Sequence, residues 1–178
     1  MKEKNIQDLE KLSSLFSNQR VGVFVDVQNM FYSAKKIKHA KLNFSKLMQK
    51  AVGSRQLIRA ISYVVDNPEI DQSGFIDMLT GNGFEIKSKP LRVRADGSAK
   101  ADWDMGIAID AVTLASKLDV IVLVSGDGDF THLVYHLQSQ GVFVEIISFP
   151  ESTHDELIKS ADKYNPIDDT LLIKSRRN

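Results

Sequence analysis

Four short apolar runs constrain most strongly how this chain can fold. They are nearly continuous in apolar residues and span Val21–Asp26, Leu57–Val65, Val120–Ser125 and Val142–Ser148. Runs of this kind are typical of strands that are buried on both faces, as in a parallel sheet that helices cover. A weaker strand is predicted at Phe84–Lys89, between the second run and the third.

Helical patterns separate these strands. Apolar residues recur at three- and four-residue steps in Ile70–Leu79, Asp104–Leu118 and Phe130–Leu137. Strands that alternate with helices predict an α/β fold, here a three-layer α/β/α, Rossmann-like sandwich with a central, mainly parallel sheet. A long polar stretch at residues 90–101 interrupts the alternation, and a loop of this size in a compact domain is usually functional.

The ends of the chain are expected to lie outside this domain. Residues 4–17 carry an amphipathic helical stripe of Ile6, Leu9, Leu12 and Phe16. We therefore divide the chain into an N-terminal helical extension (1–19), one α/β domain (20–165) and a C-terminal tail (166–178). The extension is expected to pack on the domain or on a second subunit, which leaves a homodimer open.

Composition limits the partners and the compartment. Lys and Arg together equal Asp and Glu together at 23 each, so binding of a polyanion would require a local basic patch. The absence of cysteine excludes disulfides, thiolate zinc sites and cysteine nucleophiles. The charged start lacks a signal-peptide core, and no apolar run approaches the roughly 20 residues that span a bilayer. These features predict a cytoplasmic protein with no membrane partner.

Four aspartates are predicted to meet at one edge of the sheet. Asp26 ends the first strand, Asp127 and Asp129 follow the strand that begins at Val120, and Asp104 opens a helix. In an open parallel sheet, ligands bind at the carboxyl ends of the strands, where these helices also begin. Carboxylates that meet at one edge lie close together and repel one another unless a proton or a cation neutralises them. Oxygen ligands favour Mg²⁺ or Mn²⁺ over zinc, and such an ion suits phosphodiester hydrolysis.

Each aspartate also has an ordinary structural explanation. Asp129 suits a helix cap before Phe130, and Asp127 suits a turn between two glycines. Asp104 suits the first turn of a helix, and Asp26 suits an Asx-turn at the end of a strand. We favour the metal site because all four explanations would have to hold at the single edge where sites occur.

Three segments carry these acidic residues in motif-like surroundings. VGVFVDVQNMF contains Asp26 and Asn29, KADWDMGIAIDAV contains Asp104 and Asp110, and VIVLVSGDGDFTHLV contains Asp127 and Asp129. The three segments resemble the motifs of the NYN family of PIN-like nucleases, and most of all its bacterial LabA-like branch. The resemblance covers about residues 20–150. It implies a PIN-like fold and a Mg²⁺-dependent ribonuclease site.

The resemblance also implies roles for individual residues. Asp26, Asp104, Asp127 and Asp129 would hold the metal and, together with Asn29, form the catalytic site. Asn29 would position Asp26 or a water, and Ser125 would orient the acidic loop. Asp110 lies six residues after Asp104, about 600° around a helix, so it would support the site from behind or pack the helix. Asp102 is an additional acid that could replace or supplement Asp104.

A basic patch accompanies the long polar stretch. Its members are predicted to contact the phosphates of RNA, preferably single-stranded, and are Lys87, Lys89, Arg92, Arg94 and Lys100. The alternative is a solvated hairpin. Phe31 and Tyr32 follow the first motif and could stack on an unpaired base, although core packing is the commoner role of such residues. Trp103 is expected to pack.

Other functions remain as alternatives. The fold could serve as a catalytically inactive RNA-binding or regulatory scaffold. A haloacid-dehalogenase-like phosphatase also ends a strand on an aspartate, but it requires a second aspartate where this chain has Gln28. His132 and His136 have the four-residue spacing of zinc ligands on a helix, but neither an HExxH pattern nor an obvious third ligand accompanies them.

Overall fold

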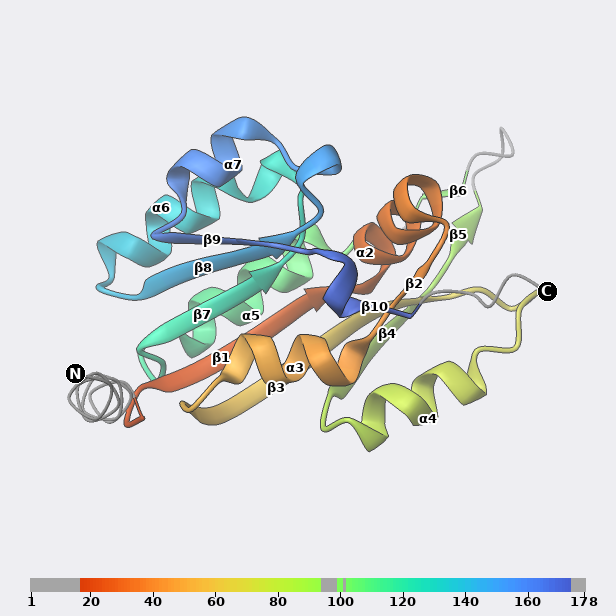
Figure 1. Ribbon diagram of the computed structural model, residues 1–178, viewed down its shortest axis with the longest axis horizontal. Helices are drawn as coiled ribbons and strands as arrows, with labels where there is room; N and C mark the ends of the chain where they lie inside the picture. Colours follow the sequence, from red (N-terminus) through yellow and green to blue (C-terminus); the bar gives the residue numbers. More distant parts are fainter. Residues whose placement is uncertain (1–16, 94–98, 101, 174–178) are drawn as a thin grey trace, which may run out of the picture.

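The chain forms a three-layer α/β structure around a parallel sheet (Figure 1). The computed structural model describes residues 17–93, 99–100 and 102–173. The sheet has six strands in the order β4-β3-β1-β7-β8-β9, and every pair of neighbours is parallel. Its strands are β1 (Arg20–Asp26), β3 (Gln56–Asp66), β4 (Glu85–Pro90), β7 (Val120–Val124), β8 (Phe143–Ser148) and β9 (Lys163–Pro166). The predicted fold class is therefore confirmed, with a sheet that is entirely parallel.

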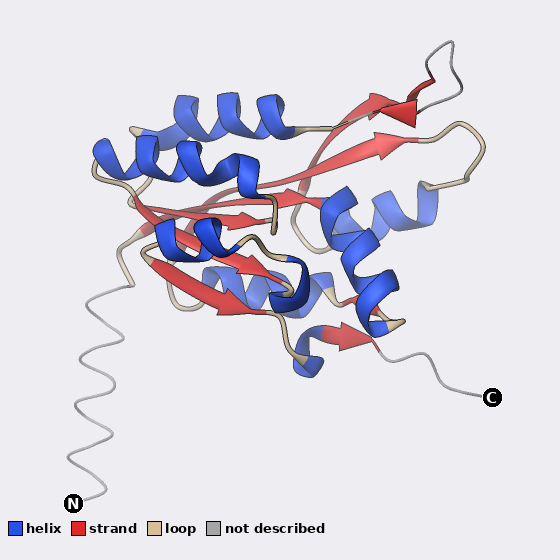
Figure 2. Cartoon of the chain, turned by 90° about the horizontal axis from the view of Figure 1, so that it is seen from above, coloured by secondary structure: helices blue, strands red, loops and turns tan. Residues whose placement is uncertain are grey.

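The apolar runs are continuous because each inner strand supplies two cores. Val23 and Val25 of β1 belong to one core, whereas Phe24 belongs to the other, on the opposite face of the sheet. Helices lie on both sides of the sheet, as the view from above shows (Figure 2). One core is packed by α2 (Val27–Ser33), α3 (Phe44–Val52) and α4 (Ser73–Gly81), and the other by α5 (Asp104–Ala115), α6 (Thr131–Ser139) and α7 (Asp155–Ser160). Within the described ranges, no helix combines the length and the apolar character that a bilayer crossing requires.

Several elements lie outside the predicted alternation. We predicted no element at α3, although Asn43 caps it by accepting a hydrogen bond from the backbone N of Lys46 at 3.1 Å. The edge strand β9 is short and polar, so its sequence carries no apolar run. In the polar stretch at 90–101, β5 (Arg92–Val93) and β6 (Ala99–Lys100) form a short antiparallel pair.

The domain continues past the predicted boundary at residue 165. Ile167, Leu171 and Leu172 are buried in the core that α3 also packs. The short strand β10 (Leu172–Ile173) pairs antiparallel with β2 (Lys41–Leu42), which precedes α3. Residues 166–173, which fall in the predicted tail, therefore return to the face of the sheet that the first helices cover. Residues 1–16 and 174–178, with the predicted N-terminal helix, lie outside the described residues.

The winding of the sheet reverses at β1. The chain passes from β1 to β3 and β4 on one side, and then returns to β7 on the other side of β1 (Figure 1). The segments that follow β1 and β7 consequently diverge to opposite faces of the sheet. Such a reversal opens a crevice at the carboxyl ends of the two neighbouring strands, which is where doubly wound proteins bind their ligands.

The burial of the C-terminal segment can be tested with two isoleucines. Truncating Ile167 (3% exposed) to alanine should lower the free energy of unfolding by about 2–4 kcal/mol, because it opens a cavity in the core. The matched control Ile173→Ala, at a side chain that is 52% exposed, should cost less than about 0.5 kcal/mol. Urea denaturation measures both, and equal costs would show that residues after 166 do not fold with the domain.

Candidate metal centre

Asp26 combines a structural role with a place at the crevice. It is the last residue of β1 and the N-cap of α2, where its Oδ1 accepts a hydrogen bond from the backbone N of Asn29 at 3.0 Å. Its Oδ2 lies 3.4 Å from the hydroxyl of Ser125, which donates to it. The side chain is nearly buried, and this burial is the largest cause that raises the pKa of Asp26. The charge of Asp127 adds to the rise, while the hydrogen bond from Asn29 opposes it.

The loop after β7 is tied to the end of β1. Asn29 Oδ1 accepts a hydrogen bond from the backbone N of Gly126 at 3.2 Å, and Ser125 Oγ accepts one from the backbone N of Asp127 at 3.3 Å. Asp127 then caps the 3-10 turn η2 (Gly128–Phe130), since its Oδ1 accepts from the backbone N of Asp129 at 3.0 Å. The turn explanations therefore hold for Asp26 and Asp127, whose side chains cap the elements that follow them. The cap predicted at Asp129 is not found, because α6 has Phe130 at its N-cap and no side-chain cap hydrogen bond.

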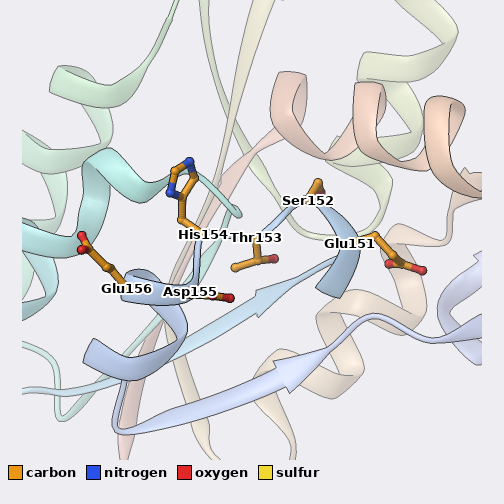
Figure 3. Close-up of a pocket in the computed structure, with 6 residues that line it drawn as sticks. All are labelled: Glu151, Ser152, Thr153, His154, Asp155 and Glu156. Carbon is orange, nitrogen blue, oxygen red and sulfur yellow. The ribbon is translucent and has the colours of Figure 1, made fainter.

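Two glycines in this loop allow a segment that is distant in the sequence to pack closely against it. A Cβ atom at Gly126 would lie 2.8 Å from the carbonyl oxygen of Ser152, and one at Gly128 would lie 2.8 Å from Cγ of His154. The backbone N of His154 also donates to the carbonyl oxygen of Gly126 at 3.1 Å. Figure 3 shows the pocket that this segment lines, with Glu151, Ser152, Thr153, His154, Asp155 and Glu156. The two glycines of the GDG pattern signal a close contact in the sequence, but the pattern does not identify the segment that makes this contact.

Three carboxylates form a compact group. Each of Asp104, Asp127 and Asp129 offers one carboxylate oxygen, and these atoms all lie within 4.8 Å of one another. Asp104 and Asp127 are partly buried, whereas Asp129 is exposed. Burial is the largest cause that raises the pKa of Asp104 to about 6, and the charges of Asp102, Asp127, Asp26 and Asp129 add to it. Asp26 is therefore close enough to act on Asp104 through its charge, but it is not one of the three residues whose carboxylate oxygens converge.

Trp103 fixes the start of α5 and thereby Asp104. Its indole Nε1 donates a hydrogen bond to the carbonyl oxygen of Val64 on β3 at 2.9 Å, and its ring packs against Tyr63. Gly106 leaves room for the ring, because a Cβ atom there would lie 2.5 Å from Cε3 of Trp103. The ammonium of Lys89 lies 4.7 Å from the ring centroid. The expected packing role of Trp103 is thus what the structure shows.

Asp110 lies away from the acidic group and joins α5 to the sheet. Its carboxylate accepts hydrogen bonds from the hydroxyl of Tyr63 and from Lys87 Nζ, each at 2.7 Å. Lys87, a predicted phosphate contact, is therefore held in an ion pair on the sheet side of α5. Among the other predicted contacts, the side chains of Arg92 and Lys100 and the whole of Arg94 lie outside the described part of the structure.

The two histidines of α6 are not part of the acidic group. His132 and His136 are exposed, and a ring nitrogen of His136 lies 2.9 Å from the side-chain amide of Gln140. Within the ranges that the structure describes, the group of residues with metal-ligand geometry is Asp104, Asp127 and Asp129, and neither histidine belongs to it. Oxygen ligands of this kind are those that Mg²⁺ and Mn²⁺ prefer, so the residues present fit a divalent ion of this class.

The fold and this site define a class of protein: a doubly wound α/β domain with an acidic cluster at the point where the winding of its sheet reverses. The model of the NYN domain family matches residues 20–168, and the chain belongs to this family. The resemblance of the three motifs is thereby confirmed. The match also extends past residue 165, in line with the burial of Ile167.

Two relatives resemble the chain over most of its length. The crystal structure of a protein of unknown function, VPA0982 from Vibrio parahaemolyticus, is 35% identical with a TM-score of 0.83, and the match covers 88% of this chain and 98% of that one. The low amplitude and bright protein LabA of Synechococcus elongatus is 28% identical over 175 residues, which covers 86% of this chain and 87% of LabA.

The raised pKa of Asp104 predicts how metal-free stability depends on pH. Between about pH 4 and pH 6 the folded protein retains a proton on Asp104 that the unfolded chain has lost, so the free energy of unfolding should fall as the pH rises. Asp104→Asn removes this loss. The free energy of unfolding of the variant, measured relative to the wild type, should therefore rise by about 1 kcal/mol from pH 4.5 to pH 7.5. This figure is reduced for solvent screening of a half-exposed carboxylate.

Urea denaturation in EDTA at the two pH values measures this gain. The control is Asp77→Asn, at an exposed aspartate on α4, which should differ from the wild type by the same amount at both pH values. A pH-independent difference for Asp104→Asn would show that neither burial nor the neighbouring charges raise the pKa of Asp104 in the folded protein.

Proposed function

We propose that this protein is a divalent-metal-dependent ribonuclease that hydrolyses RNA phosphodiester bonds at the acidic cluster. The observation that carries the proposal is the convergence of the carboxylate oxygens of Asp104, Asp127 and Asp129 within 4.8 Å, beside the nearly buried Asp26. Membership of the NYN family supports the choice of reaction, since the motifs that resemble those of PIN-like nucleases supply these same aspartates.

The acidic residues would divide the work of holding the ion. Asp104, Asp127 and Asp129 would bind Mg²⁺ or Mn²⁺ directly, and Asp26 would add negative charge from behind or complete the ligand set. A bound ion of this class supplies a nucleophilic water at neutral pH and offsets the charge of the leaving oxygen. The cation would also offset the burial and the repulsion that together raise the pKa values of Asp26 and Asp104.

The surrounding residues would keep the carboxylates in place. Asn29 and Ser125 hold the loop after β7 against the end of β1, and Trp103 holds the start of α5 against β3. Asp129 is the exposed member of the group, so it is the one that solvent reaches most readily. We assign to Asp129 the contact with the attacking water, and to Asn29 and Ser125 the positioning of Asp26 and Asp127.

Asp127→Asn separates this proposal from a purely capping role. Asparagine keeps the oxygen that accepts from the backbone N of Asp129 but removes one negative charge. Without metal, the free energy of unfolding of the variant should exceed that of the wild type by roughly 1 kcal/mol, because repulsion is relieved, and the variant should melt at a higher temperature. The stabilisation that Mg²⁺ adds should shrink. Cleavage of single-stranded RNA should fall about a hundredfold or more, because a metal ligand is lost.

Thermal melts with and without Mg²⁺, and a cleavage assay on a labelled RNA, measure these effects. Asp77→Asn is again the matched control and should leave every value unchanged. A variant that melts lower without metal, and still gains the full wild-type increment with it, would establish Asp127 as a cap alone. Equal cleavage by the wild type and Asp127→Asn would contradict the proposal that Asp127 holds a catalytic metal.

A further inference from the structure

The first helix of the domain has an exposed face that packing does not explain. Its inward residues Val27 and Met30 are buried, whereas Phe31 and Tyr32 are 53% and 60% exposed. The two rings lie edge to face with centroids 5.8 Å apart. An exposed large apolar side chain is unremarkable singly, but two adjacent aromatic rings that pack on each other offer a preformed surface for a flat ligand.

Two lysines share this face. The π-helical turn η1 (Ala34–Lys38) continues α2, and its Lys35 Nζ lies 5.9 Å from the centroid of the Phe31 ring. Lys36 is exposed as well. Within the described part of the chain, neither lysine has a carboxylate partner, in contrast to Lys38, which pairs with Glu151. In a chain without net charge, this pairing of free ammonium groups with exposed rings is a local site for an anion that carries aromatic rings.

The face follows Asp26 along the chain, and the charge of Asp26 acts on Asp104 of the acidic cluster. Asp26 caps α2, so Phe31 lies five residues further along, about 7.5 Å along the helix axis. The helix is also fixed in place: Asn29 bonds to Gly126, and the hydroxyl of Ser33 lies 2.9 Å from that of Ser152. A ligand bound on the rings would therefore be held at a constant distance from the carboxylates.

The pocket lined by residues 151–156 adjoins α2 and η1 through Ser152 and Glu151, but it is less suited to a polyanion. Its lining includes Asp155 and Glu156, both exposed, besides Glu151, which pairs with Lys38 (Figure 3). Carboxylates there would repel phosphate groups, so the charges favour a path over α2.

We propose that Phe31, Tyr32, Lys35 and Lys36, here called the α2 face, bind unpaired nucleotides next to the bond that is cut. The proposal takes its ligand, RNA, from the proposed function. Aromatic rings stack on bases of any sequence, and ammonium groups contact the adjoining phosphates. Bases inside a duplex are not available for stacking, so the α2 face selects single strands.

Binding is measured without cleavage, by fluorescence anisotropy in EDTA, with a labelled oligoadenylate about a dozen nucleotides long. The double variant Phe31→Ala/Tyr32→Ala should bind at least about tenfold more weakly. Phe31→Leu/Tyr32→Leu should be equally impaired, because it keeps apolar area but lacks rings. Tyr135→Ala is the matched control, since Tyr135 is an aromatic residue that is 52% exposed on a helix away from α2. Circular dichroism and melting curves check that each variant is folded.

The lysines are tested through the salt dependence. The plot of log K against log salt has a negative slope. Lys35→Gln/Lys36→Gln should make it less steep by roughly 1.4, about 0.7 for each phosphate contact that is lost on a single strand. Lys117→Gln/Lys159→Gln, at two exposed lysines elsewhere, should leave the slope unchanged.

The outcomes separate this proposal from the proposed function. Weaker binding by the alanine and leucine variants supports the α2 face, whether or not the wild type cleaves RNA in Mg²⁺ or Mn²⁺. Wild-type affinity in those variants would overturn it even if cleavage is observed. Equal affinity of the wild type for single-stranded and duplex RNA, or no binding of RNA, would overturn it as well.

Discussion

The burial of a carboxylate at the end of the central strand is the constraint on which the rest of this structure depends. β1 is covered on both faces, and it ends in Asp26, which is 7% exposed. A buried charge is costly unless hydrogen bonds or a cation compensate it. The helix that follows β1, the hydroxyl of Ser125 and the loop that carries Asp127 are all arranged around this side chain. The contacts that surround the buried Asp26 are therefore also the contacts that fix the geometry of the site.

The position of the acidic cluster could be predicted because it follows from topology. Continuous apolar runs indicate parallel strands, and parallel strands bring their carboxyl ends to one edge. This reasoning placed Asp26, Asp104 and Asp127 near one another although they are far apart in the chain, and the motif resemblance placed the chain in its family. The boundaries predicted for α4, α5 and α6 differ from the observed ones by only a few residues, since apolar spacing is a local signal, whereas no helix was predicted at α2, α3 or α7.

What could not be predicted depends on contacts between distant side chains. Lys87 reads as a free cation in the sequence, yet it is paired with Asp110, which a strand and a helix bring together. The segment at Ser152 and His154 carries no motif, and its contact with the two glycines is visible only in three dimensions. The polar strand β9 lacks the apolar signature because it lies at the edge of the sheet, and the core role of Ile167 depends on a return path that periodicity does not encode.

The order of the aspartates along the chain also matters while the protein is being made. Asp26 leaves the ribosome early, but Asp104 and the loop of Asp127 and Asp129 follow only after β3 and β4. Domains emerge from synthesis with the N-terminal part first. A nascent chain that has completed half of the sheet thus holds one of the acidic residues and no assembled cluster.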